Sequence, residues 1–326
     1  MSLAEAVELG LDRAAQLRPV EGRLPHVTGD DGRWRLLSPV GPEHEALTGL
    51  PWTGGFVAGQ LRLAGERDAA AAVDELLAPR ADEPTTHDLG FLFWTSGDRE
   101  LRLRAAHSLI CRALPSGVIQ VIGALDDPGW RGRTIVDTWP NLRLLWWAEQ
   151  EGFAEAGRAA RAHLDATLDV LLRPDGSTFH SARIGDDGSV LERGTVNGYA
   201  DGSTWARGQA WAIHGLVAAG HADEAELAAR WFLDHLPDDG IPPWDFDRDA
   251  PKDASAAAIT ASALLKLGWD DEARRLLEAL AARCLNRGDG DGILLHCAYR
   301  PSQRVGLDCA SAWGDYFFLE ALLGAG

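Results

Sequence analysis

The chain has 326 residues and a strongly acidic balance, with a formal net charge of −18. An acidic surface repels phosphate backbones, so this charge argues against nucleic acid as a partner. The hydrophobic fraction of 46% is enough for a large core, and no apolar run approaches the roughly 20 residues of a membrane span. No linker-like stretch divides the sequence, so we expect a single domain over residues 1–326.

The N-terminal segment and the cysteines indicate the compartment. The segment MSLAEAVELGLDRAAQL is an acidic amphipathic stretch and does not resemble a signal peptide. Cys111, Cys284, Cys297 and Cys309 include no CxxC pair, so we expect reduced, buried thiols. We therefore expect a soluble cytoplasmic protein that does not bind membranes.

Apolar residues recur with helical spacing through most of the chain. In chain order, the pattern predicts twelve helices, at residues 3–18, 53–64, 67–78, 88–96, 99–113, 137–150, 153–171, 204–219, 221–236, 253–267, 270–285 and 310–323. Short turns with a glycine, at residues 65, 97, 152, 220 and 268, separate the members of five pairs. Glycine tolerates the left-handed conformation that ends many helices. The best strand signal is VIQVIG at 118–123.

The two helices of each predicted hairpin differ in character. Segments 99–113 and 270–285 carry charges at helical spacing, which is typical of amphipathic helices. Segments 204–219 and 253–267 are almost uncharged on all sides, which is typical of buried helices. Six buried helices inside six amphipathic ones predict an all-α fold, an (α/α)6 toroid, in preference to an open helical solenoid.

Long connections fall on the side opposite the glycine turns. They cover residues 19–52, 80–87, 114–136, 173–203, 237–252 and 286–308. Functional residues gather on long loops held by a rigid scaffold, and the N-terminal ends of the six buried helices point to this same face. We expect these residues to converge on one funnel: Trp52, His87, Asp88, Asp137, Trp139, Asn197, Trp205, Arg207, Trp211, Asp253 and Trp313.

Carboxylates at helix starts also have a structural interpretation. Aspartate caps free backbone N–H groups, and we favour capping for Asp201, Asp253 and Asp308. Asp88 and Asp137 lie in motifs with histidine or aromatic residues, and both capping and catalysis remain open for them. Core packing explains most of the thirteen tryptophans. Tryptophans beside acids at a funnel mouth nevertheless suit a carbohydrate site, where aromatic faces stack on sugar rings.

Other chemistries find little support. The sequence has no HExxH, GxSxG, GxGxxG or Walker motif and no Cys/His cluster, so we expect neither a metal nor another cofactor. NRGDGDGILLH at 286–296 lacks the central glycine and late glutamate of a calcium loop, and a polar turn is the favoured interpretation. His107, His163, His221 and His235 fall on amphipathic helices, and we expect them to face solvent.

Several of these motifs resemble glycoside hydrolase family 88, the unsaturated glucuronyl hydrolases. HDLGF at 87–91 matches a family motif at every position, and GYADGSTWARGQAW at 198–211 nearly matches the family's longest motif. PWTGGF at 51–56, KDASAAAITASALLKL at 252–267 and SAWGDYFFLEALL at 311–323 extend the resemblance over most of the chain. It implies an (α/α)6 toroid whose partner is a small oligosaccharide ending in an unsaturated uronic acid.

The resemblance also implies residue roles. Asp137 corresponds to the proposed general acid and base, and Asp88 to a second active-site carboxylate. The substrate-binding candidates are Trp52, His87, Trp139, His180, Asn197, Trp205, Arg207, Trp211 and Trp313. This chain has Asn197 where the family commonly has Gln, and Gly202 in place of Asp. It also has Trp139, Pro140 and Arg143 where the family tends to have a methionine pair and a proline. We expect Asn197 and Trp139 to alter substrate preference.

The residue types fit the chemistry that this family performs. The C4=C5 bond of an unsaturated uronic acid is an enol ether, so protonation at C4 by Asp137 would create a cation at C5. Asp88 would stabilise that cation, and Arg207 would balance the uronate carboxylate. Three alternatives remain open: an unsaturated rhamnogalacturonyl hydrolase of family 105, an inverting glycosidase on the same toroid, and a sugar-binding relic without turnover.

Overall fold

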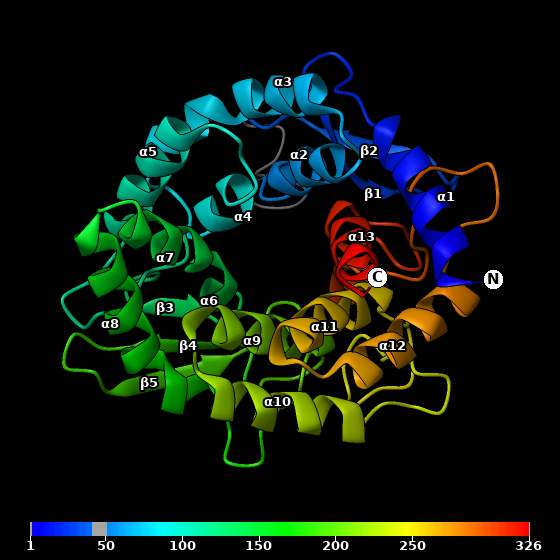
Figure 1. Cartoon of the computed structure of the whole chain (residues 1–326). Coiled ribbons are helices and arrows are strands. Elements are labelled where there is room, and N and C mark those ends of the chain that lie inside the picture. Colours follow the sequence, from blue (N-terminus) through cyan, green and yellow to red (C-terminus); the bar gives the residue numbers. More distant parts are fainter. Residues whose placement is uncertain (1, 41–50, 326) are drawn as a thin grey trace.

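The computed structural model describes residues 2–40 and 51–325. Its helices form two concentric rings (Figure 1). The outer ring contains α1 (Leu3–Ala15), α3 (Arg67–Leu77), α5 (Arg99–Ile110), α8 (Ala154–Leu171), α10 (Ala222–Asp234) and α12 (Asp270–Arg283). The inner ring contains α2 (Gly54–Leu63), α4 (Leu89–Phe93), α6 (Thr138–Asn141), α7 (Arg143–Gln150), α9 (Ala206–Ala219), α11 (Ala254–Leu267) and α13 (Ala312–Gly324). Because α13 packs against both α1 and α2, the ring closes, and the predicted (α/α)6 toroid is confirmed.

Burial follows the predicted division between the two rings. In α11 every residue from Ala254 to Leu264 is buried, whereas α5 buries mainly one stripe that includes Leu101, Ala105 and Leu109. The uncharged segments therefore line the interior, where a charge would be costly to desolvate. None of the helices in the described ranges has the length and apolarity needed to cross a membrane.

Helix boundaries differ from the prediction mainly in the inner ring. The segment predicted as one helix at 137–150 is two helices, α6 and α7, because the chain tightens at Leu142. The Leu142 N–H bonds to the carbonyls of both Thr138 and Trp139. Helix α4 is a single short turn, and a 3₁₀ helix η2 (Ala78–Asp82) follows α3.

Five short strands were not predicted. Strands β1 (Leu24–Thr28) and β2 (Trp34–Leu37) form an antiparallel pair, and β3 (Arg133–Ile135), β4 (Ser181–Ile184) and β5 (Val190–Gly194) form a three-stranded antiparallel sheet. The segment 118–123, which carries the best strand signal in the sequence, forms only isolated bridges, through Ile119 and Ile122. A second 3₁₀ helix, η3 (Pro301–Gln303), lies at the tip of a hairpin-like loop.

The glycine turns behave as predicted at four of five positions. Gly220 and Gly268 end α9 and α11 with φ of 78° and 77°, in the left-handed region, and two more adopt positive φ. Gly97 has no positive φ. The turn at Gly97 is instead tied by its N–H, which donates to Asp74 Oδ2 at 3.2 Å.

The structure also corrects two predictions, on the exposure of one histidine and on the capping role of two of the three aspartates. His163 was expected to face solvent but is fully buried, because its Nδ1 accepts a hydrogen bond from the Ile119 N–H. Capping is found for Asp253, which accepts from Ser255 N, whereas Asp201 accepts from Thr195 N in a loop and Asp308 pairs with His296.

The 286–296 segment forms the polar turn that was favoured over a calcium loop. Its carbonyl oxygens at Gly288, Gly290 and Gly292 accept hydrogen bonds from the Arg13 guanidinium. The positively charged Arg13 side chain of α1 therefore binds the carbonyl oxygens that would otherwise be available to a metal cation.

Neighbouring inner helices approach closely at glycines. A Cβ added to Gly90 on α4 would lie 2.3 Å from the Asn141 carbonyl oxygen on α6, and one added to Gly55 on α2 would lie 2.1 Å from the Phe91 carbonyl oxygen. Asn141 also joins the two helices, since its Oδ1 accepts from Phe91 N and its Nδ2 donates to the Asp137 carbonyl. The first turns of α4 and α6 are therefore held side by side.

We predict that Gly90→Ala lowers the midpoint of thermal unfolding, because its Cβ would overlap backbone that cannot move away cheaply. Overpacking of this kind costs about 1–3 kcal/mol. Gly202→Ala is a matched control, since no atom lies within 4 Å of its added Cβ. Equal unfolding temperatures for the two variants would show that α4 and α6 can move apart without loss of stability.

Candidate active site

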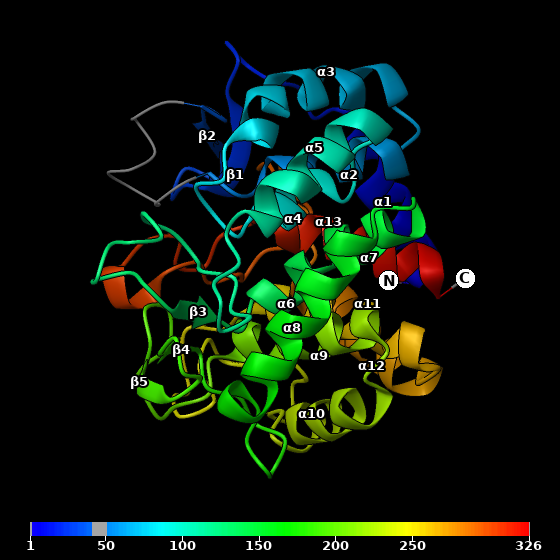
Figure 2. The same cartoon turned by 90° about the vertical axis from the view of Figure 1, so that its left-hand side faces the viewer.

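The strands and long loops gather at one end of the toroid, while the short helix–helix turns and both chain ends lie at the other (Figure 2). The loops surround a cavity of about 540 Å³. Nine of the predicted residues line it: Trp52, His87, Asp88, Asp137, His180, Asn197, Trp205, Arg207 and Trp211. The connections that carry them are separated by up to about half the chain, so the toroid creates the site by bringing helix starts together.

Asp88 and Asp137 occupy equivalent places in two neighbouring hairpins. Each is the residue before an inner helix, α4 and α6 respectively, yet neither side chain makes a capping hydrogen bond. Asp88 Oδ2 accepts from the Thr86 hydroxyl at 3.0 Å. The carboxylates are thus not used to cap their helices, and both face the cavity.

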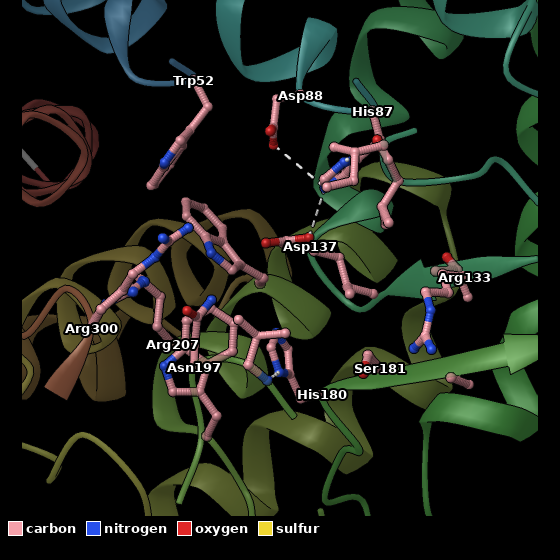
Figure 3. A pocket seen from close by; sticks show the side chains of 18 of the residues that line it. Trp52, His87, Asp88, Arg133, Asp137, His180, Ser181, Asn197, Arg207 and Arg300 are labelled. Carbon is pink, nitrogen blue, oxygen red and sulfur yellow. Dashed lines mark hydrogen bonds and ion pairs between the residues drawn. The ribbon is translucent and has the colours of Figure 1, made fainter. Parts of the chain in front are cut away.

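His87 lies between the two carboxylates (Figure 3). Its Nε2 is 3.0 Å from Asp137 Oδ1 and 3.4 Å from Asp88 Oδ1, and its Nδ1 is 3.2 Å from the Val121 carbonyl oxygen. Burial alone would lower the pKa of His87, but the charges of Asp88 and Asp137 outweigh it and raise that pKa to about 9. Both ring nitrogens are engaged, and Nε2 links the two carboxylates at the cavity wall.

The pKa of Asp88 is also raised. Burial is the main cause, and the nearby Asp137 charge adds to it, whereas His87 and Thr86 oppose the change. The side chains of Asp88, His87 and Asp137 form one group of neighbouring ionisable residues, in which His87 is buried and the two carboxylates are partly exposed.

Strand pairing places His180 beside Asp137. Ile135 on β3 pairs with Ser181 on β4, and the Val136 N–H donates to the His180 carbonyl at 2.9 Å. His180 Nδ1 accepts from the Val196 N–H at 3.0 Å, so the ring proton must lie on Nε2 when the ring is neutral. Burial lowers the pKa of His180 to about 4, which keeps the ring neutral at physiological pH.

Three polar atoms at the cavity wall have no hydrogen-bond partner among the described residues. They are His180 Nε2, Asn197 Oδ1 and Trp205 Nε1. A buried polar atom left without a partner costs free energy. The residues that carry these two donors and one acceptor all line the cavity.

Arg207 lines the cavity, but its positive charge is paired with the Asp253 carboxylate. Its Nη1 donates to Asp253 Oδ2 at 2.7 Å, and its Nη2 donates to the Tyr299 carbonyl at 2.8 Å. The guanidinium also lies between the rings of Trp205 and Trp313, at 4.7 and 5.2 Å. This pairing favours a structural role for Arg207, in which it supports the cavity wall. The expected role was to balance the charge of a uronate carboxylate.

Two predicted binding residues do not line the cavity. Trp139 is fully buried and points away from the axis, because its Nε1 donates to Thr167 on α8 at 2.9 Å. Trp313 is also fully buried and packs behind Trp52, with ring centroids 4.8 Å apart. The predicted substrate-binding roles of Trp139 and Trp313 are therefore corrected, since both side chains pack behind the cavity wall. Trp139 adds no bulk beside Asp137.

Several lining residues were missed by the sequence analysis. They include Trp130, Arg133, Ser181, Tyr299 and Arg300. Trp130 stands out because this large apolar residue is 37% exposed. The others lie on strands of three or four residues or in the loop that precedes α13, where no periodic pattern marks them. The described residues contain no cluster of three or more side chains suited to hold a metal ion.

Two carboxylates in a tryptophan-lined cavity at one end of an (α/α)6 toroid are typical of a glycoside hydrolase, and the comparisons with known proteins show that class. It is 33% identical to the unsaturated glucuronyl hydrolase of Bacillus sp. (strain GL1), over 95% of this chain and 93% of that protein. It is 30% identical to the unsaturated chondroitin disaccharide hydrolase of Streptococcus pyogenes serotype M1, over 86% of this chain and 82% of that protein.

The structural comparison agrees. The crystal structure of the Bacillus sp. GL1 unsaturated glucuronyl hydrolase has a TM-score of 0.87 at 30% identity, covering 99% of this chain and 96% of that one. No family model matches the chain. On the identity and coverage of these relatives, the protein belongs to the unsaturated glucuronyl hydrolases, glycoside hydrolase family 88.

We predict that His180 makes the protein sensitive to acid. Its folded pKa of about 4 lies below the ordinary value of 6.5, so the unfolded chain binds an additional proton as the pH falls through this window. The free energy of unfolding should fall by up to about 1.4 kcal/mol per pH unit from this residue alone. Urea unfolding between pH 7 and 4 measures it, and His180→Gln should show a shallower fall.

The exposed His107 on α5 provides the control. His107→Gln should retain the native slope. If His180→Gln has the same slope as the native protein, His180 is not held neutral by burial.

Proposed function

We propose that this protein hydrolyses short oligosaccharides that end in an unsaturated uronic acid, by adding water across the C4=C5 bond. The observation that carries the proposal is the placement of Asp88 and Asp137 around one nitrogen of His87 in a cavity with aromatic walls. The assignment of residues to steps rests on that geometry and on the family's chemistry. We also propose a cytoplasmic location, which the four unpaired cysteine thiols support.

In the first step Asp137 donates a proton to C4 of the enol ether. The positive charge then resides on C5 and the ring oxygen, and the Asp88 carboxylate stabilises it at short range in a site with little water. Asp137, now ionised, accepts a proton from the water that attacks C5. The resulting hemiketal opens, and the neighbouring sugar leaves.

The cavity walls have separate roles in this scheme. His180 Nε2–H and Trp205 Nε1–H donate to substrate hydroxyl groups, and Asn197 Oδ1 accepts from one. Trp52 and Trp211 offer flat faces to the sugar rings. Arg207, neutralised by Asp253, supports the Trp205 wall.

A panel of unsaturated disaccharides from chondroitin, hyaluronan, heparin, xanthan, gellan and pectin tests the proposed function. Turnover removes the ultraviolet absorbance of the C4=C5 bond and releases the neighbouring sugar. An ordinary glycosidase would release sugar and retain the absorbance, and a sugar-binding relic would do neither. Activity confined to the pectin fragment would favour the family 105 alternative.

We predict that Asp137→Asn abolishes turnover without changing the fold, because the amide cannot supply the proton. Asp88→Asn should retain a trace of activity. Loss of one acid or base typically lowers the rate ~10²–10⁴-fold. Circular dichroism and steady-state kinetics check both variants. Near-native turnover by Asp137→Asn would remove Asp137 from the proposed role, and unfolding would mean that the side chain is chiefly structural.

We predict that Asn197→Gln changes the order of preferred substrates. Asn197 Oδ1 has no partner in the described structure, and Gln would carry this acceptor one methylene further into the cavity. The Asn197 main chain should stay in place, because its carbonyl accepts from Trp244 Nε1 at 2.6 Å. The ratios of kcat/KM across the panel are the measurement. An unchanged ranking means that Asn197 does not determine specificity.

A further inference from the structure

The hydrogen bonds of His87 restrict where its protons lie. The Val121 carbonyl accepts from the His87 main-chain N–H at 2.9 Å and lies 3.2 Å from the ring Nδ1. A carbonyl oxygen only accepts, so Nδ1 carries a proton. The remaining nitrogen, Nε2, then faces the Oδ1 atoms of Asp137 and Asp88.

A neutral ring with its proton on Nδ1 would direct the Nε2 lone pair at two carboxylates. That arrangement repels unless a proton lies between the nitrogen and one oxygen. The proton belongs either to an imidazolium, with both carboxylates ionised, or to a carboxylic acid that donates to a neutral ring. The two states contain the same atoms and differ only in the position of one proton.

We propose that His87 stores the proton that Asp137 delivers to the substrate, a role that rests on the proposed function. In the free protein His87 is an imidazolium between two carboxylates. Substrate entry expels water and brings a further carboxylate into the cavity, which favours the state with neutral His87 and protonated Asp137. His87 is thus a positioning residue that acts through Asp137, and it need not touch the sugar.

The proton is conserved through the cycle. The Nε2–H bond breaks as the Asp137 O–H bond forms, and that O–H bond breaks in turn as the C4=C5 electron pair takes the proton and forms the new C4–H bond. Water adds its oxygen to C5 and returns one proton to Asp137. When the product leaves, this proton moves back to Nε2, and no external acid or base is needed.

The surroundings of His87 favour the imidazolium in the free protein. Asp88 and Asp137 face Nε2, and together they raise the pKa of His87 to about 9 despite its burial. Arg80 on η2 acts on Asp88 and not directly on His87. His163 on α8 is also buried, and since burial lowers its pKa to about 3, it carries no charge that would oppose the imidazolium.

Nuclear magnetic resonance of the ¹⁵N-histidine-labelled protein, without substrate, tests the charge state directly. We expect one histidine with both ring nitrogens protonated at pH 7.5, and we expect this signal to disappear in His87→Gln. A neutral His87 ring at that pH overturns the proposal. This measurement needs no turnover, so its outcome is independent of whether the disaccharide panel supports the proposed function.

The pH dependence of kcat/KM separates proton storage from a purely structural role. His87→Gln retains an amide donor near Nε2 but no titratable proton, so the alkaline limb should move down by about one pH unit or more and kcat should fall roughly 10²-fold with little change in KM. His87→Asn retains the donor to the Val121 carbonyl and should show the same shift of the alkaline limb and the same fall in kcat. It serves as a second variant in case His87→Gln does not fold.

His180→Gln is the matched control, since it changes a second buried histidine of the same cavity. It should lower activity and leave the alkaline limb in place. If the limb stays in place in both His87 variants, His87 holds the carboxylates only as a spacer and the proposal fails.

Discussion

A single imidazole nitrogen shared by two carboxylates is the constraint on which the rest of the site depends. His87 Nε2 contacts Asp137 and Asp88, and the Val121 carbonyl fixes the other side of the ring. Two ionised carboxylates this close would repel in a site with little water. A protonated His87 between them offsets this repulsion, and the roles proposed for the three residues depend on that contact.

The toroid is what brings these groups together. The inner helices approach within backbone contact at Gly55 and Gly90, so successive helix starts lie side by side. Asp88 and Asp137 precede α4 and α6, and neither side chain makes a capping hydrogen bond. On the far wall, the Arg207–Asp253 pair is buried and hydrogen-bonded, and breaking such a pair is costly. The wall that carries Trp205 is therefore stiff.

Much of this could be predicted because helical periodicity is a local signal. The uncharged stretches marked the inner ring, and the motif HDLGF pointed to His87 and Asp88. The orientation of Trp139 could not be predicted, since it depends on how α6 is rotated against α8. The pairing of Arg207 with Asp253 joins two hairpins, and strands β3 and β4 are too short to produce a pattern. These features depend on tertiary contacts, which a single sequence does not encode locally.

The central claim is that water adds across the C4=C5 bond with Asp137 as the proton donor. Running the reaction in deuterium oxide, and separately in oxygen-18 water, tests it most directly, with the labels located by nuclear magnetic resonance and mass spectrometry. The account predicts one solvent deuterium on C4 of the uronate product and solvent oxygen at C5. Product with an intact double bond, no deuterium on C4 and solvent oxygen at C1 would contradict it, because those labels indicate ordinary glycosidic cleavage.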